Sequence, residues 1–233
     1  MELLYEGKAK KVYATDIKNV LRIEYKNSAT AFNGVKKDVI EGKGILNNLF
    51  SSYFFDLLRK EGVESHFLQK ISDTEQLVTQ VKIIPLEVIV RNVAAGTLAK
   101  RIGVEEGHIM NFPIIELCYK RDDLGDPMLN DDHIIALDIA TFDELKELKQ
   151  KALRINEVLI AYFKNFNLDL IDFKIEFGKT SDGEILLADE VSPDTCRLWD
   201  ATTKQKFDKD VFRRDIAPLR ETYQALADKL GIS

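Results

Sequence analysis

The chain is poor in the residue types on which disulfide frameworks and zinc sites depend. Its 233 residues include two cysteines, Cys118 and Cys196, and three dispersed histidines. Two cysteines provide no disulfide framework and are typical of a reducing compartment, so we expect a cytoplasmic protein. The histidines lack the spacing of zinc ligands, and none has a partner in sequence that would indicate catalysis.

Net positive charge and long apolar runs are also absent. The 33 Lys and Arg are outnumbered by 39 Asp and Glu, which gives a formal net charge of -6. No overall basic field would therefore attract nucleic acid. No apolar run approaches the length of a membrane span, and the first residues lack the pattern of a signal peptide. We expect neither nucleic acid nor a membrane as a partner, and any anionic ligand must be held by local cations and backbone amides.

The order of the predicted elements favours an α+β fold. Short strands are predicted at about 2–7, 10–16, 20–26, 66–71, 76–83 and 86–91. Helices are predicted at about 43–61, 94–102 and 141–166, and a capping box at Thr141 and Glu144 opens the last of them. Because strands come first and helices dominate later, we expect an N-terminal antiparallel-sheet lobe, residues 1–84, followed by a larger α+β lobe, residues 85–233.

The segment 170–189 predicts a hairpin with charged residues on one face. Asp172, Lys174 and Glu176 alternate with apolar residues, as in a strand with two different faces. Residues 181–184, Ser-Asp-Gly-Glu, follow as a turn signal. If Asp-Gly is a two-residue turn, counting back along both strands places Glu176 directly opposite Asp189.

Two opposed carboxylates would lie about 4.5–5.5 Å apart at Cβ and would repel each other unless a cation lay between them. Glu176 and Asp189 beside Lys174 therefore suggest a Mg²⁺ ion that carries the phosphates of a nucleotide. Taken alone, however, the pattern also fits a surface hairpin with solvated charges, which is the more ordinary arrangement.

Two further segments have the residues of anion sites. Gly7 and the lysines after it lie between two predicted strands and resemble the glycine-containing hairpin that covers phosphates in kinase-like folds, although a basic surface hairpin is the simpler interpretation. Residues 91–97 end a strand and open a helix, where Arg91, Thr97 and exposed amides would suit a phosphate monoester. Equally, Arg91 could pair with a carboxylate.

The residues after the hairpin leave both structural and functional interpretations open. Asp194 could be a turn-capping residue with no further role, and Arg197 could be a surface cation. The run 208–214 reads as a helix start with an acidic first turn and solvated arginines. Cys196 has no base within the segment, so we do not expect it to be a nucleophile.

Taken together and in order, these segments resemble the SAICAR synthetases of purine biosynthesis over nearly the whole chain. The motifs that carry the resemblance are residues 7–10 (GKAK), 43–44 (KG), 72–75 (SDTE), 90–92 (VRN), 95–97 (AGT), 126–128 (DPM), 172–178 (DFKIEFG), 189–190 (DE), 192–194 (SPD) and 197–200 (RLWD). One such motif would be weak evidence, but the ordered set is specific.

The resemblance implies an ATP-dependent ligase that joins the carboxylate of carboxyaminoimidazole ribotide to the amine of L-aspartate, with ATP bound in the cleft between the two lobes. A carboxylate is a poor acyl donor, so phosphorylation to an acyl phosphate, with phosphate as the leaving group, would precede attack by the amine. The resemblance also implies Mg²⁺ and a homodimer. The alternatives are a small-molecule kinase with a related ATP site and a nucleotide-binding module without catalysis.

The resemblance also assigns roles to the nucleotide side of the site. Glu176 and Asp189 would hold Mg²⁺, and Lys174 would neutralise charge on the transferring group. The residues expected at ATP are Gly7, Lys8, Ala9, Lys10 and Val12 at the phosphates, Lys82 and Ile83 with Val81 at adenine, Glu87 at the ribose, and Lys120 and Asp126 in the loop nearby.

On the substrate side, Asp194 would orient the amino or imidazole group. The residues expected at the ribotide phosphate are Arg91, Gly96, Thr97 and Arg197, with Arg213 nearby. For L-aspartate, Lys43 and the segment 28–34 are candidates. Many members of the family have an aspartate where this chain has Asn33, so an acidic role there does not carry over.

Overall fold

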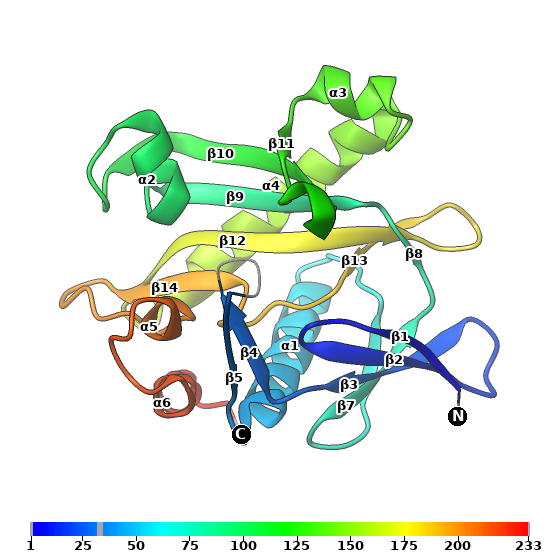
Figure 1. The fold of residues 1–233 in the computed structure, drawn as a ribbon, viewed down its shortest axis with the longest axis horizontal. Helices are drawn as coiled ribbons and strands as arrows, with labels where there is room; N and C mark the ends of the chain where they lie inside the picture. The colour runs from blue at the N-terminus through cyan, green and yellow to red at the C-terminus, as the bar shows by residue number, and fades with distance from the viewer. Residues whose placement is uncertain (1, 32–34, 233) are drawn as a thin grey trace.

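The computed structural model describes residues 2–31 and 35–232, and these form two larger sheets, a short ribbon and six α-helices (Figure 1). The first sheet has five antiparallel strands. In spatial order they are β1 (Leu3–Glu6), β2 (Lys10–Ala14), β3 (Val20–Tyr25), β7 (Glu75–Thr79) and β6 (Phe67–Lys70). The α+β fold class is confirmed.

The second sheet has seven strands and is built around the long strand β12 (Leu168–Lys179). The first half of β12 pairs with β9 and β14, and its last residues pair with β8 and β13. The other strands are β8 (Lys82–Ile83), β9 (Leu86–Val93), β10 (Ile109–Tyr119), β11 (Met128–Leu129), β13 (Ile185–Ala188) and β14 (Cys196–Asp200).

Helices pack against these sheets, and a short ribbon lies beside them (Figure 1). The helices are α1 (Lys43–Lys60), α2 (Gly96–Ile102), α3 (Asp131–Ala136), α4 (Phe142–Lys164), α5 (Asp210–Arg213) and α6 (Leu219–Leu230), with a 3-10 turn η1 (Asp122–Leu124) and the ribbon strands β4 (Ser28–Ala31) and β5 (Lys36–Val39). The predicted capping box opens α4: the Thr141 hydroxyl accepts a hydrogen bond from the Glu144 amide, and the Glu144 carboxylate accepts one from the Thr141 amide. None of the helices in 2–31 and 35–232 has the length and apolarity needed to cross a bilayer.

One large hydrophobic core joins α1, α4 and the second sheet. Phe54 of α1 packs edge-on against Phe163 of α4 with ring centroids 5.4 Å apart, and both side chains are fully buried. The same core includes Leu86 and Phe173 from the sheet. The core therefore takes residues from both sides of the predicted boundary at 84–85, and the division into lobes 1–84 and 85–233 stays a prediction.

The predicted register of the hairpin is wrong by one residue. Glu176 lies opposite Ala188, and Thr180 pairs with Glu184, so the turn contains three residues instead of two. The Thr180 hydroxyl accepts a hydrogen bond from the Glu184 amide and Gly183 adopts φ +88°, which together close the longer turn. Asp189 is thus the first residue after β13 and is not a strand partner of Glu176.

Gly178 of β12 provides a close approach between the two halves of the chain. A Cβ atom at this position would lie 2.5 Å from Cγ2 of Val81 and 3.3 Å from the Lys82 carbonyl oxygen. No side chain larger than hydrogen fits without moving the segment that leads into β8.

We expect Gly178→Ala to lower the free energy of unfolding by about 1–3 kcal/mol, the usual cost of overpacking a core. Urea unfolding measures the change. Ser181→Ala, in the exposed turn of the same hairpin, is the control and should stay within about 0.5 kcal/mol of the wild type. Equal midpoints for Gly178→Ala and the wild type would contradict this close packing.

Candidate active site

A cavity of about 920 Å³ is lined by residues of both large sheets. Its lining includes apolar side chains from β2, β3 and β7 and charged side chains from β9 and β12. The predicted site residues that line it are Gly7, Lys8, Ala9, Lys10, Val12, Ile83, Glu87, Arg91, Thr97, Lys120, Asp126, Lys174, Glu176, Asp189, Asp194, Arg197 and Arg213. The fold thus brings together residues that are up to about 200 positions apart in the sequence.

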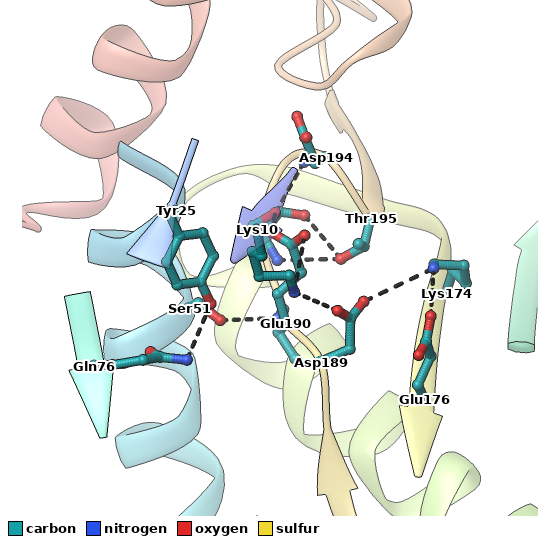
Figure 2. A network of polar contacts seen from close by, with 12 residues as sticks. Lys10, Tyr25, Ser51, Gln76, Lys174, Glu176, Asp189, Glu190, Asp194 and Thr195 are labelled. Atoms are coloured by element: carbon teal, nitrogen blue, oxygen red, sulfur yellow. Dashed lines mark hydrogen bonds and ion pairs between the residues drawn. The ribbon is translucent and has the colours of Figure 1, made fainter. Parts of the chain in front are cut away.

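Lys174 lies at the centre of a group of carboxylates in this cavity. Its ammonium donates to Glu87 at 3.0 Å. It also donates to Glu176 at 3.0 Å and lies 3.8 Å from an oxygen of Asp189 (Figure 2). Lys120 donates to the same Glu176 oxygen at 2.5 Å. Glu176 is only 2% exposed, so the carboxylate is not solvated, and the surface-hairpin interpretation does not describe it.

Asp189 reaches this group although the predicted register is wrong. It has φ +61°, a left-handed conformation that turns the chain out of β13. Its carboxylate pairs with Lys10 of β2, which also lies 3.4 Å from Glu190. The backbone turn, and not strand pairing, therefore brings Asp189 to the same cavity as Glu176.

The ion pairs keep this group charged. Burial opposes the charged form of Asp189, but Lys10 and Lys174 more than offset it and hold its pKa well below the usual range. Burial would likewise lower the pKa of Lys174, but Glu176 and Asp189 raise it well above its ordinary value. At neutral pH the cavity therefore presents carboxylates and ammonium groups and no neutral acid or amine at these positions.

The donor set fits Mg²⁺ bound together with phosphates. Within residues 2–31 and 35–232, no three or more His, Cys, Asp or Glu side chains gather closely enough to cage a metal ion alone. Mg²⁺ is commonly held by one or two carboxylates, substrate phosphates and water. Glu176 and Asp189, two hard oxygen donors that contact one cation, Lys174, meet that requirement.

A second charged group alternates arginines and carboxylates. Asp172 of β12 accepts from Arg91 at 2.7 Å and from Arg197 at 2.8 Å. Asp210 of α5 accepts from Arg197 at 2.9 Å and from Arg213 at 2.6 Å. Arg91 pairs with carboxylates, as one of its two interpretations expects. It also lines the cavity, and its binding of a phosphate stays a prediction. The three arginines are thereby fixed around one part of the cavity as candidates for binding an anion.

Three predicted site residues do not line the cavity. Gly96 has φ +54° and lies behind Arg197: a Cβ there would be 2.7 Å from a guanidinium nitrogen, so the glycine leaves room for the arginine. Lys82 is exposed and pairs with Lys179 in the ladder between β8 and β12. Lys43 is 1% exposed and donates to Asp194 at 2.6 Å, so it can reach a ligand only through that carboxylate.

Asp194 is held from three sides. Besides Lys43, it is contacted by Lys209 at 3.3 Å and accepts a hydrogen bond from the Tyr223 hydroxyl at 2.6 Å. Burial disfavours its charged form, yet Lys43 and Lys209 hold its pKa well below the usual range. Asp194 is therefore a fixed, ionised hydrogen-bond acceptor at the cavity and not a turn cap alone.

Sequence reasoning missed several partners in these groups. For Lys209 and Asp210 the sequence predicts only a helix start with an acidic first turn, whereas Lys209 lines the cavity and Asp210 is 1% exposed. Tyr223 lies on the amphipathic helix α6 and carries no local signal of a polar role. Cys196 is buried, and burial raises the pKa of its thiol to about 12, in agreement with the expectation that it is not a nucleophile. Asn33 lies outside the described residues.

Comparison with known proteins identifies the family to which this fold belongs. The profile of the SAICAR synthetase family matches residues 3–230. The phosphoribosylaminoimidazole-succinocarboxamide synthase of Anoxybacillus flavithermus is 65% identical over 229 residues, which cover 98% of this chain and 95% of that protein. The crystal structure of the Ehrlichia chaffeensis enzyme of that name superposes with a TM-score of 0.97 at 42% identity, covering 100% of this chain and 99% of that chain. A structure described as SAICAR synthetase (Type-2) in complex with ADP has a TM-score of 0.94 at 47% identity, covering 97% of this chain and 96% of that chain. This chain belongs to the SAICAR synthetase family.

Proposed function

We propose that the protein joins carboxyaminoimidazole ribotide to L-aspartate with hydrolysis of ATP, forming the succinocarboxamide SAICAR, ADP and phosphate in purine biosynthesis. The observation that carries the proposal is that a lysine–carboxylate group and an arginine group line one cavity. A family match over residues 3–230 and a structural neighbour bound to ADP support the same activity.

ATP phosphates would lie against the glycine hairpin and the lysines near it. Lys10 lies beside Asp189, and Lys8 reaches Asp122 at 2.7 Å across the cavity. When bound, Mg²⁺ would supply positive charge between the carboxylates of Glu176 and Asp189 and the phosphate oxygens. Lys174, released from these carboxylates, would neutralise charge on the transferring phosphoryl group, which is the main requirement of phosphoryl transfer.

The ribotide would be anchored by its 5′-phosphate at Arg91, Thr97 and Arg197, with Arg213 adjacent. Guanidinium groups that are already fixed by carboxylates lose little freedom when they bind a phosphate, so they can position the ribotide carboxylate toward ATP. Asp194 stays ionised and would accept a hydrogen bond from an amino group, which suits orientation of the nucleophile or of the imidazole amine.

We also propose that the protein acts as a cytoplasmic homodimer with ATP between residues 1–84 and 85–233. Support for the ATP position is that the cavity is lined from both ranges, by Lys10 and Val12 on one side and by Glu87 and Lys174 on the other. Cysteine usage and a role in purine biosynthesis support the compartment.

An assay of ADP release that omits ATP, ribotide or L-aspartate in turn tests the proposed reaction. We expect product, detected by mass as the succinocarboxamide, only when all three substrates are present. A small-molecule kinase, which the relatives do not favour, would leave a stable phosphorylated product without L-aspartate. Such a product would contradict the ligase assignment.

Asp189→Asn tests the metal assignment, because it removes one ligand charge with little change of shape. We expect turnover to fall by about 10²–10³-fold, as when one charge-stabilising group is removed from other active sites. Initial rates over a Mg²⁺ titration measure the effect. Asp182→Asn, in the exposed turn of the same hairpin, is the matched control and should behave as wild type. Near-normal Mg²⁺-dependent turnover of Asp189→Asn would refute the assignment.

Arg197→Lys tests the phosphate site better than Arg197→Ala, because truncation would leave the buried carboxylates of Asp172 and Asp210 without a partner. Lysine keeps the charge but loses the planar, two-pronged donor set, so we expect the KM for the ribotide to rise roughly tenfold, with the KM for ATP little changed. Arg214→Lys is the control, since Arg214 pairs with Glu106 and does not line the cavity. A rise in the KM for ATP alone would contradict the placement of the ribotide phosphate at Arg197.

A further inference from the structure

Tyr223 brings a neutral hydroxyl group to the carboxylate of Asp194. It lies on the buried face of α6, at helical spacing from Leu219, Leu226 and Leu230. The side chain is fully buried, and its ring is part of the large hydrophobic core. Phenylalanine would fill such a position in the core equally well, so packing does not account for the hydroxyl group.

The two oxygens of Asp194 have different partners. Oδ2 accepts from Lys43 at 2.6 Å and from Lys209 at 3.3 Å, whereas Oδ1 accepts from Tyr223 at 2.6 Å. A carboxylate oxygen has about two lone-pair positions, so donors from residues 2–31 and 35–232 occupy both positions on Oδ2 and one on Oδ1. A ligand that donates to Asp194 would therefore find its open position on Oδ1, the oxygen bonded to Tyr223.

The backbone of Asp194 is held without help from Tyr223. Its amide donates to the Ser192 hydroxyl at 3.1 Å, and the Thr195 amide donates to the Ser192 carbonyl at 3.0 Å. These bonds fix the turn between β13 and β14. Loss of the Tyr223 hydroxyl would leave this turn in place and free only the carboxylate, whose terminal torsion has broad minima.

The tyrosine acts as a donor and not as an acid. Burial, and then the charge of Asp194, raise the pKa of the Tyr223 hydroxyl well above its ordinary value. A hydroxyl that donates to an ionised carboxylate forms a charge-assisted bond, which is about twice as strong as a bond between neutral groups. Tyr223 can therefore hold Asp194 in one orientation without exchanging a proton.

The charges around Asp194 favour a neutral donor from the ligand. Burial lowers the pKa of the Lys209 ammonium, although the charge of Asp194 opposes the change. Lys43 and Arg213 lie close enough to lower it further, and Glu190 offsets this in part. The ammonium group of L-aspartate would add another cation to this cluster, whereas the amino group on the imidazole ring of the ribotide is neutral.

We propose that Tyr223 is a positioning residue, which fixes Oδ1 of Asp194 so that this oxygen accepts a hydrogen bond from the ring amine of the ribotide. The ring amine takes no part in the ligation, so the bond would orient the imidazole and, with it, the carboxylate that is phosphorylated. The inference rests on the proposed function, in which Asp194 could bond either to this amine or to the nucleophile.

A ribotide analogue with hydrogen in place of the ring amine tests the inference on the wild type alone. The analogue keeps the carboxylate and the 5′-phosphate, and its competitive inhibition constant is measured against the ribotide in the ligation assay. We expect this constant to exceed the KM for the ribotide by about tenfold or more, the worth of one hydrogen bond to a charged group. Equal values would overturn the inference, and this result needs no variant to fold.

Tyr223→Phe removes the hydroxyl and keeps the ring that fills the core. We expect the KM for the ribotide to rise about tenfold, toward the constant of the analogue. The KM for ATP and the inhibition constant of the analogue should stay within about twofold of the wild type, because neither ligand uses the positioned oxygen. Loss of folded protein would lower kcat alone, so the change in KM separates positioning from a purely structural role.

Tyr162→Phe is the matched control, because it removes a hydroxyl that donates to the hydroxyl of Tyr53 at 2.9 Å outside the cavity. It should keep all wild-type constants. An unchanged KM for the ribotide in Tyr223→Phe would contradict the inference, as would an equal rise in the constant of the analogue, which would indicate a reshaped pocket. Absence of the succinocarboxamide from the wild type with all three substrates would instead refute the proposed function, and the inference with it.

Discussion

The carboxylates of Glu176 and Asp189 can share one buried cavity only because ammonium groups lie against both of them. Lys174 contacts the two together, Lys120 adds a second cation to Glu176, and Lys10 adds one to Asp189. Burial alone would raise the pKa of Asp189 and favour the protonated acid, but Lys10 and Lys174 more than offset that effect. A protonated acid is a poor ligand for Mg²⁺, so the charge state required for nucleotide chemistry depends on the lysines.

The same dependence explains how the cavity can accept a highly charged ligand. In the proposed function, ATP with Mg²⁺ would bring both signs of charge: the phosphates would pair with the lysines, and the carboxylates would hold the metal ion. Each ion pair that breaks would then be exchanged for another, and no buried charge would be left alone. The arginine group follows the same logic, since a ribotide phosphate would join Asp172 and Asp210 as a further anion among three guanidinium groups.

One strand supplies the link between the two charged groups. The period of two along β12 directs Asp172, Lys174 and Glu176 to one face, with Asp172 among the arginines and Glu176 among the lysines. Four residues along a strand span about 13 Å, so the two groups are separated by roughly that distance along β12. The shared face of Asp172, Lys174 and Glu176 could be predicted from the sequence, because alternation over a few residues is a local property.

Features that depend on distant parts of the chain could not be predicted in this way. The register failed because Thr180 closes a three-residue turn, a choice that Asp-Gly alone does not determine. No strand was predicted for β10, where Pro113 lies in a stretch with a register shift between Ile109 and Ile114. The resemblance to a family assigned a role to Asp194 but none to Lys209 or Tyr223, which bond to Asp194 and fix its position. Family motifs mark residues expected at the ligand more readily than the residues that support those side chains.

His66 is a further residue whose surroundings could not be predicted from the sequence. In the sequence it is one of three dispersed histidines without a partner, and no pattern marks it as part of a site. Its surroundings arise only in the folded chain, where Leu187 and Thr79 fix its backbone and where Nε2 has no hydrogen-bond partner among residues 2–31 and 35–232. Lys174 and its carboxylates are fully compensated before any ligand binds, whereas Nε2 of His66 is not. The charged groups would therefore exchange one partner for another at little net cost when a charged ligand binds.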